Sequence, residues 1–573
     1  MTDMRRTILW VVFSMSLILL WDAWNKHTGR PSMFSPTPVA QQPAASAAPA
    51  DGTAAATTLP APATRAPPRS RATQAPRPAA GSAAAQRLEI TTDVVKAVID
   101  TQGGTLSHLE LLNYADQEDR SRNVVLLDQS AQRVYLAQTG LINKDDAGER
   151  FPNHFTVMTA EEGGARRLAD GQDRLEVKLS SPVVGGLQYI KTYTFQRGQY
   201  TIGVRHEVIN RAEAPREPQL YLQLVRDGNP PPGESAFYFT FTGPALYTDQ
   251  KKFHKIDFKD IERGKAETAA PADNGWIAMV QHYFASAWLL NVPGHDRLAR
   301  EFRTAKVSNN LYSIAMVVPL PPVAAGESRT VETTLFVGPQ EEKKLAALAP
   351  GLELVKDYGW FTILSKPLFW LLDKLHALLG NWGWSIVALV VLLKAAFYGL
   401  NASAYRSMAK MKAVAPRITE LRERYKDKPQ QMQQEMMRIY REEKVNPMGG
   451  CLPILIQIPV FIALYWVLLS SVEMRNAPWI LWIDDLSAKD PYYILPLLMT
   501  ASTLLQTWLN PTPPDPIQAK MMWIMPLMFS VMFFFFPAGL VLYWLTNNLL
   551  SIAQQWYINK KLGVLDLKFS PKS

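Results

Sequence analysis

A lysine stands inside an otherwise apolar segment of this chain. Lys394 lies in the run from Ser385 to Leu400, where most neighbours are Val, Leu, Ala or Ile. A charge at the centre of a bilayer-spanning helix costs about 2.5 to 3.5 kcal/mol on insertion scales, so it is usually kept for a pathway, a partner or a site. The alternative is snorkelling, because the stem can reach toward headgroups over part of the roughly 10 Å of helix rise to Asn401. By itself the residue leaves both interpretations open.

Other apolar segments also contain polar side chains. These are Gln457, then Thr500, Ser502, Thr503 and Gln506, then Thr546, Asn547 and Asn548. Polar side chains in membrane helices usually hydrogen-bond one helix to another. Because several segments contain them, together with a lysine, the pattern favours a water-containing cavity.

The sequence lacks the common motifs for bond chemistry. It has no GxxxxGK[ST], no Cys/His cluster of metal-binding type and no GxSxG. The single cysteine, Cys451, excludes an intrachain disulfide and is interpreted as a packing residue. The net charge is +9, but the basic residues are not interleaved with aromatics in one compact domain, so no specific DNA binding is expected. We predict no enzyme activity, no cofactor, no metal and no catalytic residue.

The first 86 residues are predicted to form an anchor and a tether. Residues 1–30 contain Arg5 and Arg6, an apolar run, and then Trp21 and Trp24. No small-residue cleavage site follows directly, which favours an uncleaved transmembrane anchor over a cleaved signal peptide. Residues 31–86 are rich in Pro, Ala, Thr, Ser and Gln and cannot bury enough apolar surface to fold, so we expect a disordered tether.

A β-strand pattern follows the tether. Apolar residues alternate with polar ones in segments such as Gln188–Phe195 and Tyr200–Ile209, with Gly and Asn turns between such segments. The pattern predicts an all-β sandwich domain over residues 87–345. His282 lies in an aromatic stretch of this domain and is interpreted as a packed or hydrogen-bonded residue rather than a ligand.

The rest of the chain is predicted to be helical. In residues 346–381 the spacing of the charged residues leaves one face of a helix apolar. This pattern indicates an amphipathic helix that lies in the plane of the lipid headgroups. Residues 382–558 form the predicted core, and the basic tail is 559–573. Spans are expected at about 382–401, 452–470, 492–509, 522–536 and 539–555, which with the anchor makes six.

The segment between the first two core spans is strongly basic. It contains eleven Lys or Arg residues against six acids, which predicts a cytoplasmic location. Parity then places both termini in the cytoplasm and the β domain outside, in the periplasm of a bacterium. Helical periodicity broken at Asp427–Pro429 predicts a helical hairpin over 403–446. Its outer faces offer a basic platform for ribosomal RNA or another docking partner, formed by Arg417, Arg422, Arg424, Lys426 and Lys428.

Four stretches resemble those of the YidC membrane protein insertase family of Gram-negative bacteria, part of the YidC/Oxa/Albino group. They are Gly275–Trp288, Lys444–Pro453, Asp490–Pro496 and Phe536–Trp544. The resemblance covers nearly the whole chain in the same order, except the tether and the tail. It implies a multi-pass inner-membrane protein that inserts and helps to fold integral membrane proteins, alone or with the Sec translocon. The implied partners are nascent membrane proteins, SecYEG, SecDF, the ribosome through the hairpin and tail, and the phospholipid bilayer.

The resemblance also implies a site. The family has a five-helix core with a hydrophilic groove that is open to the cytoplasm and the lipid and contains one positive residue. By position that residue is Lys394, where the family usually has arginine; lysine keeps the charge but lacks the guanidinium fork. A family tyrosine pair matches Tyr543 and Trp544, and the indole cannot supply the second hydroxyl. The predicted groove residues are Lys394, Gln457, Thr503, Gln506, Tyr543, Trp544 and Asn547.

Two other functions are compatible with part of the sequence. A secondary transporter could use an intramembrane lysine, but it predicts inverted repeats, and the basic hairpin has no counterpart in the other half of the chain. A membrane-anchored periplasmic binding module would leave Lys394 and the polar spans without a role.

Overall fold

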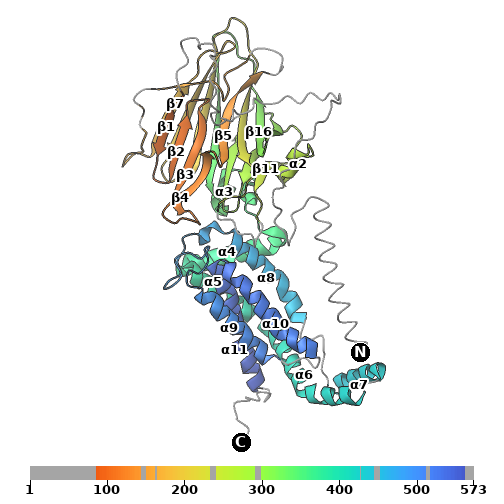
Figure 1. Cartoon of the computed structure of the whole chain (residues 1–573). Helices are drawn as coiled ribbons and strands as arrows, with labels where there is room; N and C mark the ends of the chain where they lie inside the picture. The colour runs from red at the N-terminus through yellow and green to blue at the C-terminus, as the bar shows by residue number, and fades with distance from the viewer. Residues whose placement is uncertain are drawn as a thin grey trace, which may run out of the picture. The chain divides into compact units, whose positions relative to one another are not determined.

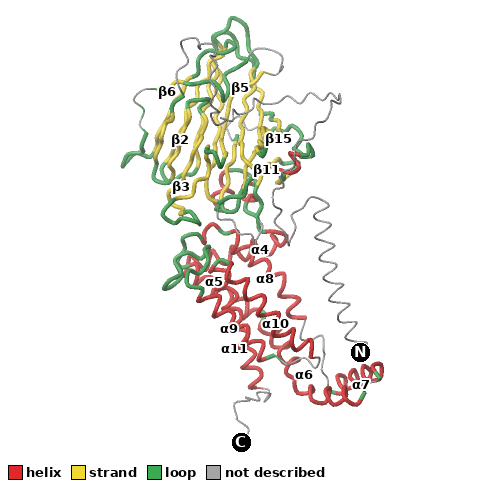
Figure 2. The backbone as a smooth tube through the Cα atoms, in the orientation of Figure 1, coloured by secondary structure: helices red, strands yellow, loops and turns green. Residues whose placement is uncertain are grey.

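Strands occupy the first part of the described chain and helices the second (Figures 1 and 2). The computed structural model describes residues 85–143, 150–161, 164, 166–232, 240–290, 298–425, 428–443, 452–510 and 516–561. All of these residues belong to one compact unit, Thr58–Ser573. The predicted anchor, all but the last two residues of the tether, Lys426, Cys451 and the tail beyond Lys561 lie outside the described residues.

Two antiparallel sheets form the β domain, which we define by its strands, Arg87–Pro339. In spatial order, the first sheet contains β1 (Arg87–Thr91), β2 (Val95–Asp100), β3 (Thr105–Ala115), β4 (Asn123–Gln129), β5 (Val134–Asn143), β10 (Pro218–Asp227), β16 (Leu311–Pro319) and β15 (Glu301–Ser308). The second contains β12 (Lys252–Lys255), β11 (Gly243–Thr248), β13 (Trp276–Val280), β14 (Phe284–Leu289), β17 (Ser328–Pro339), β9 (Thr201–Asn210), β8 (Leu187–Gln196), β7 (Arg174–Ser180) and β6 (Thr159–Ala160). Helix α2 (Phe258–Glu262) follows β12.

Period-two alternation explains why these segments are strands with one buried face. In β8 every second side chain is buried, among them Leu187, Tyr189, Tyr193 and Phe195. Buried side chains of both sheets join in one hydrophobic core between them. The predicted all-β sandwich is therefore confirmed.

A glycine makes one close approach inside the sandwich possible. Gly103, in the turn between β2 and β3, has a φ of +70°. A Cβ at this position would lie 2.3 Å from the backbone of His154, so a larger residue would force the two backbone segments apart.

The helical part follows a short connection from the last strand. Its elements are α3 (Glu342–Leu348), η1 (Leu352–Val355), η2 (Gly359–Phe361), α4 (Thr362–Leu379), α5 (Trp382–Ala396), α6 (Tyr398–Arg424), α7 (Pro429–Glu442), α8 (Leu452–Ser470), η3 (Val472–Met474), α9 (Ile494–Leu509), α10 (Pro516–Met532), η4 (Phe533–Phe535) and α11 (Ala538–Lys561). Helix α11 packs against α5 and α9, and α4 packs against α5 and α8 (Figure 1). Their buried apolar residues form a second core.

Length and hydropathy decide which helices could cross a bilayer. Within the described residues, no single helix is long and apolar enough by itself to cross a membrane. One pair passes the test together, Trp382–Ala396 with Tyr398–Met408, although the two helices are bent by 68°.

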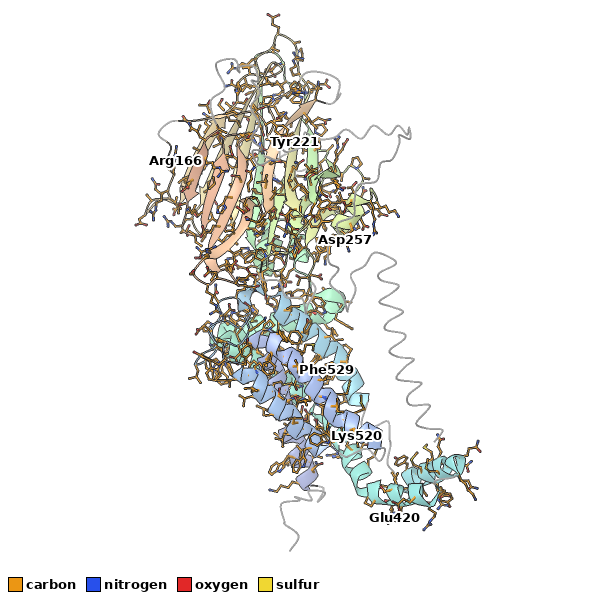
Figure 3. The ribbon with its side chains drawn as sticks, in the orientation of Figure 1. Arg166, Tyr221, Asp257, Glu420, Lys520 and Phe529 are labelled. Carbon is orange, nitrogen blue, oxygen red and sulfur yellow. The ribbon has the colours of Figure 1, made fainter. Side chains whose placement is uncertain are left out.

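The predicted break near Asp427 falls between α6 and α7. Helix α6 ends at Arg424 and α7 starts at Pro429, a residue suited to the first helical turn. The two helices share a small apolar cluster that contains Val414 and Ile418 of α6 with Met436, Ile439 and Tyr440 of α7. Glu420 of α6 is labelled in Figure 3.

Candidate functional site

Lys394 lies in the last turn of α5. The helix starts at a defined point because the Asn381 side chain accepts a hydrogen bond from the backbone N–H of Trp384, at 3.0 Å. The carbonyl groups at the C-terminal end of a helix carry partial negative charge and favour a cation there. The end of α5 therefore stabilises the ammonium group of Lys394.

The side chain of Lys394 reaches across to α11. Its Nζ donates to Ser551 Oγ at 2.8 Å, and Ser551 Oγ donates to the backbone carbonyl of Asn547 at 2.7 Å. Tyr405 of α6 also hydrogen-bonds the Ser551 side chain. We call Lys394, Tyr405, Asn547 and Ser551 the Lys394 cluster. It joins three helices and leaves Lys394 itself half-buried.

Helical spacing explains why α11 has two polar faces. Asn547, Ser551 and Gln554 are spaced i, i+4, i+7 and so share one face; Ser551 contacts α5 and Gln554 donates to the carbonyl of Tyr398 at 3.4 Å. Asn548 and Gln555 are seven residues apart and both turn toward α9.

The contact of Asn548 with α9 includes one predicted site residue. Asn548 Nδ2 donates to Thr503 Oγ1 at 3.0 Å and to Ser502 Oγ at 3.4 Å. Both hydroxyls donate in turn to the carbonyl of Met499, each at 2.8 Å. These contacts connect α9 to α11 and are separate from the Lys394 cluster.

Tyr543 and Trp544 lie in apolar surroundings. Both are buried, and the Trp544 ring lies 4.9 Å from Phe533, 5.5 Å from Phe536 and 5.5 Å from Phe461 between ring centroids. The Phe461 ring also lies 5.4 Å from that of Tyr543. The structure therefore places this pair in the aromatic packing of the helical core.

The remaining predicted groove residues are two glutamines. Gln457 of α8 and Gln506 of α9 are half-buried. Sequence reasoning omitted Ser551, although its position four residues after Asn547 puts it on the same helix face as that predicted residue. Tyr405 was omitted because it lies beyond the predicted span, and only the bend after α5 shows that it turns toward α11.

The basic residues of α6 and α7 are largely exposed. Arg424 and Lys428 face solvent, and Arg417 pairs with Glu443 at 2.5 Å. The side chain of Arg422, like Lys426, lies outside the described set. Lys394 and these residues belong to different parts of the helical region.

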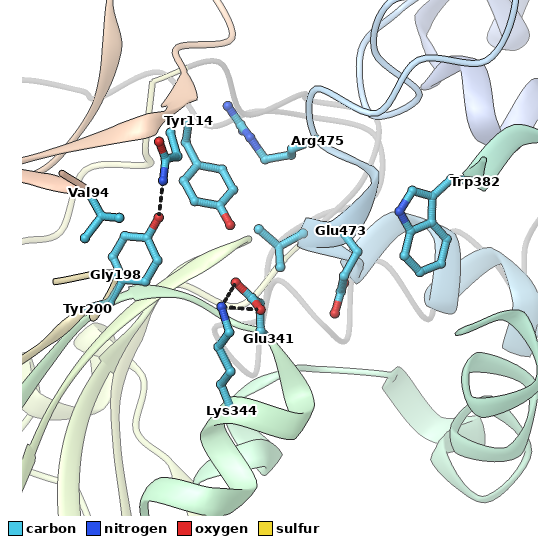
Figure 4. Close-up of a pocket in the computed structure, with 11 residues that line it drawn as sticks. Val94, Tyr114, Gly198, Tyr200, Glu341, Lys344, Trp382, Glu473 and Arg475 are labelled. Atoms are coloured by element: carbon cyan, nitrogen blue, oxygen red, sulfur yellow. Dashed lines mark hydrogen bonds and ion pairs between the residues drawn. The ribbon is translucent and has the colours of Figure 1, made fainter. Parts of the chain in front are cut away.

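A charged cavity lies where the β domain meets the helices. It has a volume of about 400 Å³, and Figure 4 shows Glu341 and Lys344 pairing at one side, with Tyr200 near Tyr114. The Lys344–Glu341 distance is 2.9 Å. Glu473, which also lines the cavity, forms an ion pair with the fully buried Lys356 at 2.9 Å. These charges are therefore compensated within the chain.

Direct hydrogen bonds also connect the β domain to the helical part. His282 Nε2 donates to the carbonyl of Leu469 at 2.9 Å, as the interpretation of a hydrogen-bonded histidine required. Burial lowers the pKa of His282 to about 4, helped by the nearby Arg475. Arg475 donates to the carbonyl of Ala115, and its guanidinium lies 5.2 Å from the ring centroid of Tyr283. In the described part of the chain, no group of three His, Cys, Asp or Glu side chains is arranged to hold a metal ion.

Comparison with known proteins covers both halves of the chain. The family model described as the YidC periplasmic domain matches residues 87–371, and the one described as the 60Kd inner membrane protein matches residues 374–564. Membrane protein insertase YidC of Cupriavidus metallidurans is 55% identical over 98% of this chain and 98% of its own, and that of Cupriavidus necator is 56% identical with the same coverage. A crystal structure described as an active YidC insertase with the first transmembrane domain resolved covers 82% of this chain and 92% of its own, at 19% identity and a TM-score of 0.38.

Proposed function

Because the chain belongs to the YidC family of membrane protein insertases, we propose that it inserts client proteins into the inner membrane through a hydrophilic groove containing Lys394. The family consists of insertases rather than enzymes, and the relatives give no support to a transporter or a binding module. The observation that carries the proposal is the bond from Lys394 to Ser551, since it turns the charge toward polar groups of another helix.

The proposed topology follows the charge distribution. Five spans, corresponding to α5, α8, α9, α10 with η4, and α11, form the core, and an anchor within residues 1–30 adds a sixth. The basic helices α6 and α7 form a cytoplasmic hairpin over 403–446, and the amphipathic segment 346–381 lies at the periplasmic surface. Both termini are then cytoplasmic, and the β domain, with the boundaries 87–345, is periplasmic.

Insertion needs no bond chemistry. The transfer of each apolar residue of a client segment into lipid is favourable by roughly 0.3 to 0.6 kcal/mol. The insertion of a segment of about twenty such residues is therefore favourable in free energy. The obstacle is the polar flank, which must cross hydrocarbon. A wet groove shortens the dry distance, and the ammonium group of Lys394 attracts an acidic flank by charge alone.

The outer surface of the core suits the departure of the client. Helix α10 exposes apolar side chains, among them Ile524, Leu527 and Phe529, the last labelled in Figure 3. The client segment leaves along α8 and α10 into the lipid. Tyr543, Trp544, Gln457, Gln506, Thr503 and Asn547 are proposed to line its path together with Lys394.

Partners are proposed on the same basis. Arg417, Arg422, Arg424, Lys426 and Lys428, with the tail 559–573, would attract ribosomal RNA electrostatically. SecYEG and SecDF would deliver some clients, and others would arrive directly from the ribosome.

Crosslinking tests the proposal. A photoreactive amino acid at position 394 should crosslink to a stalled nascent membrane protein in inner-membrane vesicles. The same probe at Leu392, an exposed α5 position two residues from Lys394 and so on the opposite side of the helix, serves as the matched control and should give little product. If position 394 yields no client adduct while position 392 does, Lys394 does not face the client and the proposal is wrong.

A further inference from the structure

We infer that Ser551 is a positioning residue for Lys394: its hydroxyl holds the ammonium group against α11, where an acidic client flank can meet it. The inference rests on the proposed function. It assigns a role to a serine that the sequence motifs do not single out.

The hydrogen-bonding capacity of Ser551 is fully used. A serine hydroxyl has one donor and two acceptor positions. The donor goes to the carbonyl of Asn547 in its own helix at 2.7 Å. The acceptors face Lys394, at 2.8 Å, and Tyr405. Because the donor is engaged, the hydroxyl can only accept from Lys394, which suits a cation.

Ser551 is buried, which limits the movement of its hydroxyl group. Ser551 is only 4% exposed, so no bulk water competes freely for its oxygen. Lys394 is half-buried, and its flexible four-carbon stem could otherwise point along the helix surface toward headgroups. An ammonium group has three N–H donors, so one bond to Ser551 leaves two for a carboxylate.

The same contact could serve only to join α5 to α11. That purely structural role predicts that loss of the hydroxyl slows every client alike. A positioning role predicts a loss confined to clients whose translocated flank is acidic, since only they use the charge. The chain contains a matched control in Ser530 of α10, which is equally buried and donates to the carbonyl of Pro526 at 2.7 Å.

The test uses the full-length protein in reconstituted vesicles. Initial insertion rates are measured for one client with an acidic translocated flank and for the same client with that flank changed from Asp to Asn. Ser551→Ala should lower the acidic-flank rate about fivefold, as expected for loss of one hydrogen bond of typical net strength, and leave the neutral-flank rate unchanged. Ser551→Thr, which keeps the hydroxyl, should restore the rate, and Ser530→Ala should change neither.

A chemical measurement supports the kinetic one. Lys394 in Ser551→Ala should be acylated faster by a water-soluble ester, as judged by mass spectrometry, because the amine is no longer held against α11. If Ser551→Ala does not accumulate, Ser551→Cys provides a same-sized side chain with a weak acceptor. Equal slowing of both clients, or an unchanged acylation rate, would overturn the inference.

Lys394→Met distinguishes failure of the role of Ser551 from failure of the role of the charge. If it slows the acidic-flank client while Ser551→Ala does not, Ser551 has no positioning role and the proposed function stands. If Lys394→Met also has no effect on that client, the proposed role of the charge fails.

Discussion

Two lysines, one in each half of the molecule, show how the surroundings decide what a charge can do. Lys191 of β8 is fully buried in the β sandwich, and its Nζ donates to the carbonyls of Gly103 at 2.5 Å and Thr139 at 2.9 Å. Lys394 of α5 is half-buried and donates to a side-chain hydroxyl. Those backbone carbonyls cannot move without distorting the turn and the strand that contain them, whereas a lysine bonded to one hydroxyl can still receive a ligand.

Two buried tyrosine–histidine pairs lie near Lys191 within the sandwich. Tyr189 hydrogen-bonds His206 at 2.6 Å, and Tyr221, labelled in Figure 3, hydrogen-bonds His154 at 2.5 Å. Burial lowers the pKa of Lys191 to about 7 and that of His154 to about 4, the latter also because of the nearby Lys191. Buried inside the sandwich, these groups affect the stability of the β domain rather than the client.

The largest expected effect comes from reversing the charge that is left accessible. Lys394→Glu converts an attraction of a few kcal/mol, at an effective dielectric constant of about 20, into a repulsion of similar size. We expect the insertion rate of acidic-flank clients in reconstituted vesicles to fall about tenfold or more, while Lys394→Arg is tolerated. Lys191→Met is the contrasting variant and should leave this rate unchanged. Unchanged insertion in Lys394→Glu would remove the functional difference between the two lysines.

Acid should act on the β domain and on its contact with the helices. The pKa values of His154 and His282 are about 4 in the folded protein, below the ordinary histidine value of 6.5. The unfolded chain therefore binds more protons as pH falls from 6.5 to 4, and stability is lost across that window, by at most roughly 3 kcal/mol per histidine.

Urea unfolding of the full-length protein in detergent, followed by tryptophan fluorescence between pH 7 and pH 4, measures this loss. His154→Asn retains an acceptor for the Tyr221 hydroxyl and should reduce the acid sensitivity by roughly a third, because it removes one of three buried histidines, His154, His206 and His282, whose pKa burial lowers. The same pH dependence in His154→Asn as in the unaltered chain would show that His154 does not contribute.

The smallest effect concerns Lys191 under alkaline conditions. Its folded pKa of about 7 lies below the unfolded value of 10.5, so the unfolded chain holds more protons between these values and stability rises with pH. From pH 7 to pH 9 we expect a gain of about 2 kcal/mol, measured by urea unfolding. Lys191→Met should abolish this gain. A gain that persists in Lys191→Met would mean that other groups cause it.

Local patterns predicted the β domain well. Alternation in Gln188–Phe195 correctly indicates a strand, and it puts Lys191 on the same face as Tyr189 and Tyr193. Alternation cannot show which carbonyl groups accept hydrogen bonds from Lys191, because Gly103 and Thr139 are 88 and 52 residues away in sequence.

The helical part was predicted less completely. Hydropathy located the apolar segments, yet a span predicted over 382–401 bends by 68° after Ala396, and α6 begins at Tyr398 rather than after the span. Apolar periodicity alone does not show where a helix bends. The aromatic burial of Tyr543 and Trp544 likewise depends on Phe461 and Phe533, which come from other helices.

By itself the sequence determined that the chain has a β-strand part and a helical part, and that one apolar segment contains a charge. Strand and helix periodicity and hydropathy are local properties. Only the tertiary structure decided what that charge contacts. Ser551 lies 157 residues from Lys394, and a side-chain hydrogen bond over such a separation exists only after the helices have packed. Whether Lys394 snorkels or serves a site was therefore open in the sequence, and the packing of α5 against α11 directs its ammonium group to a hydroxyl.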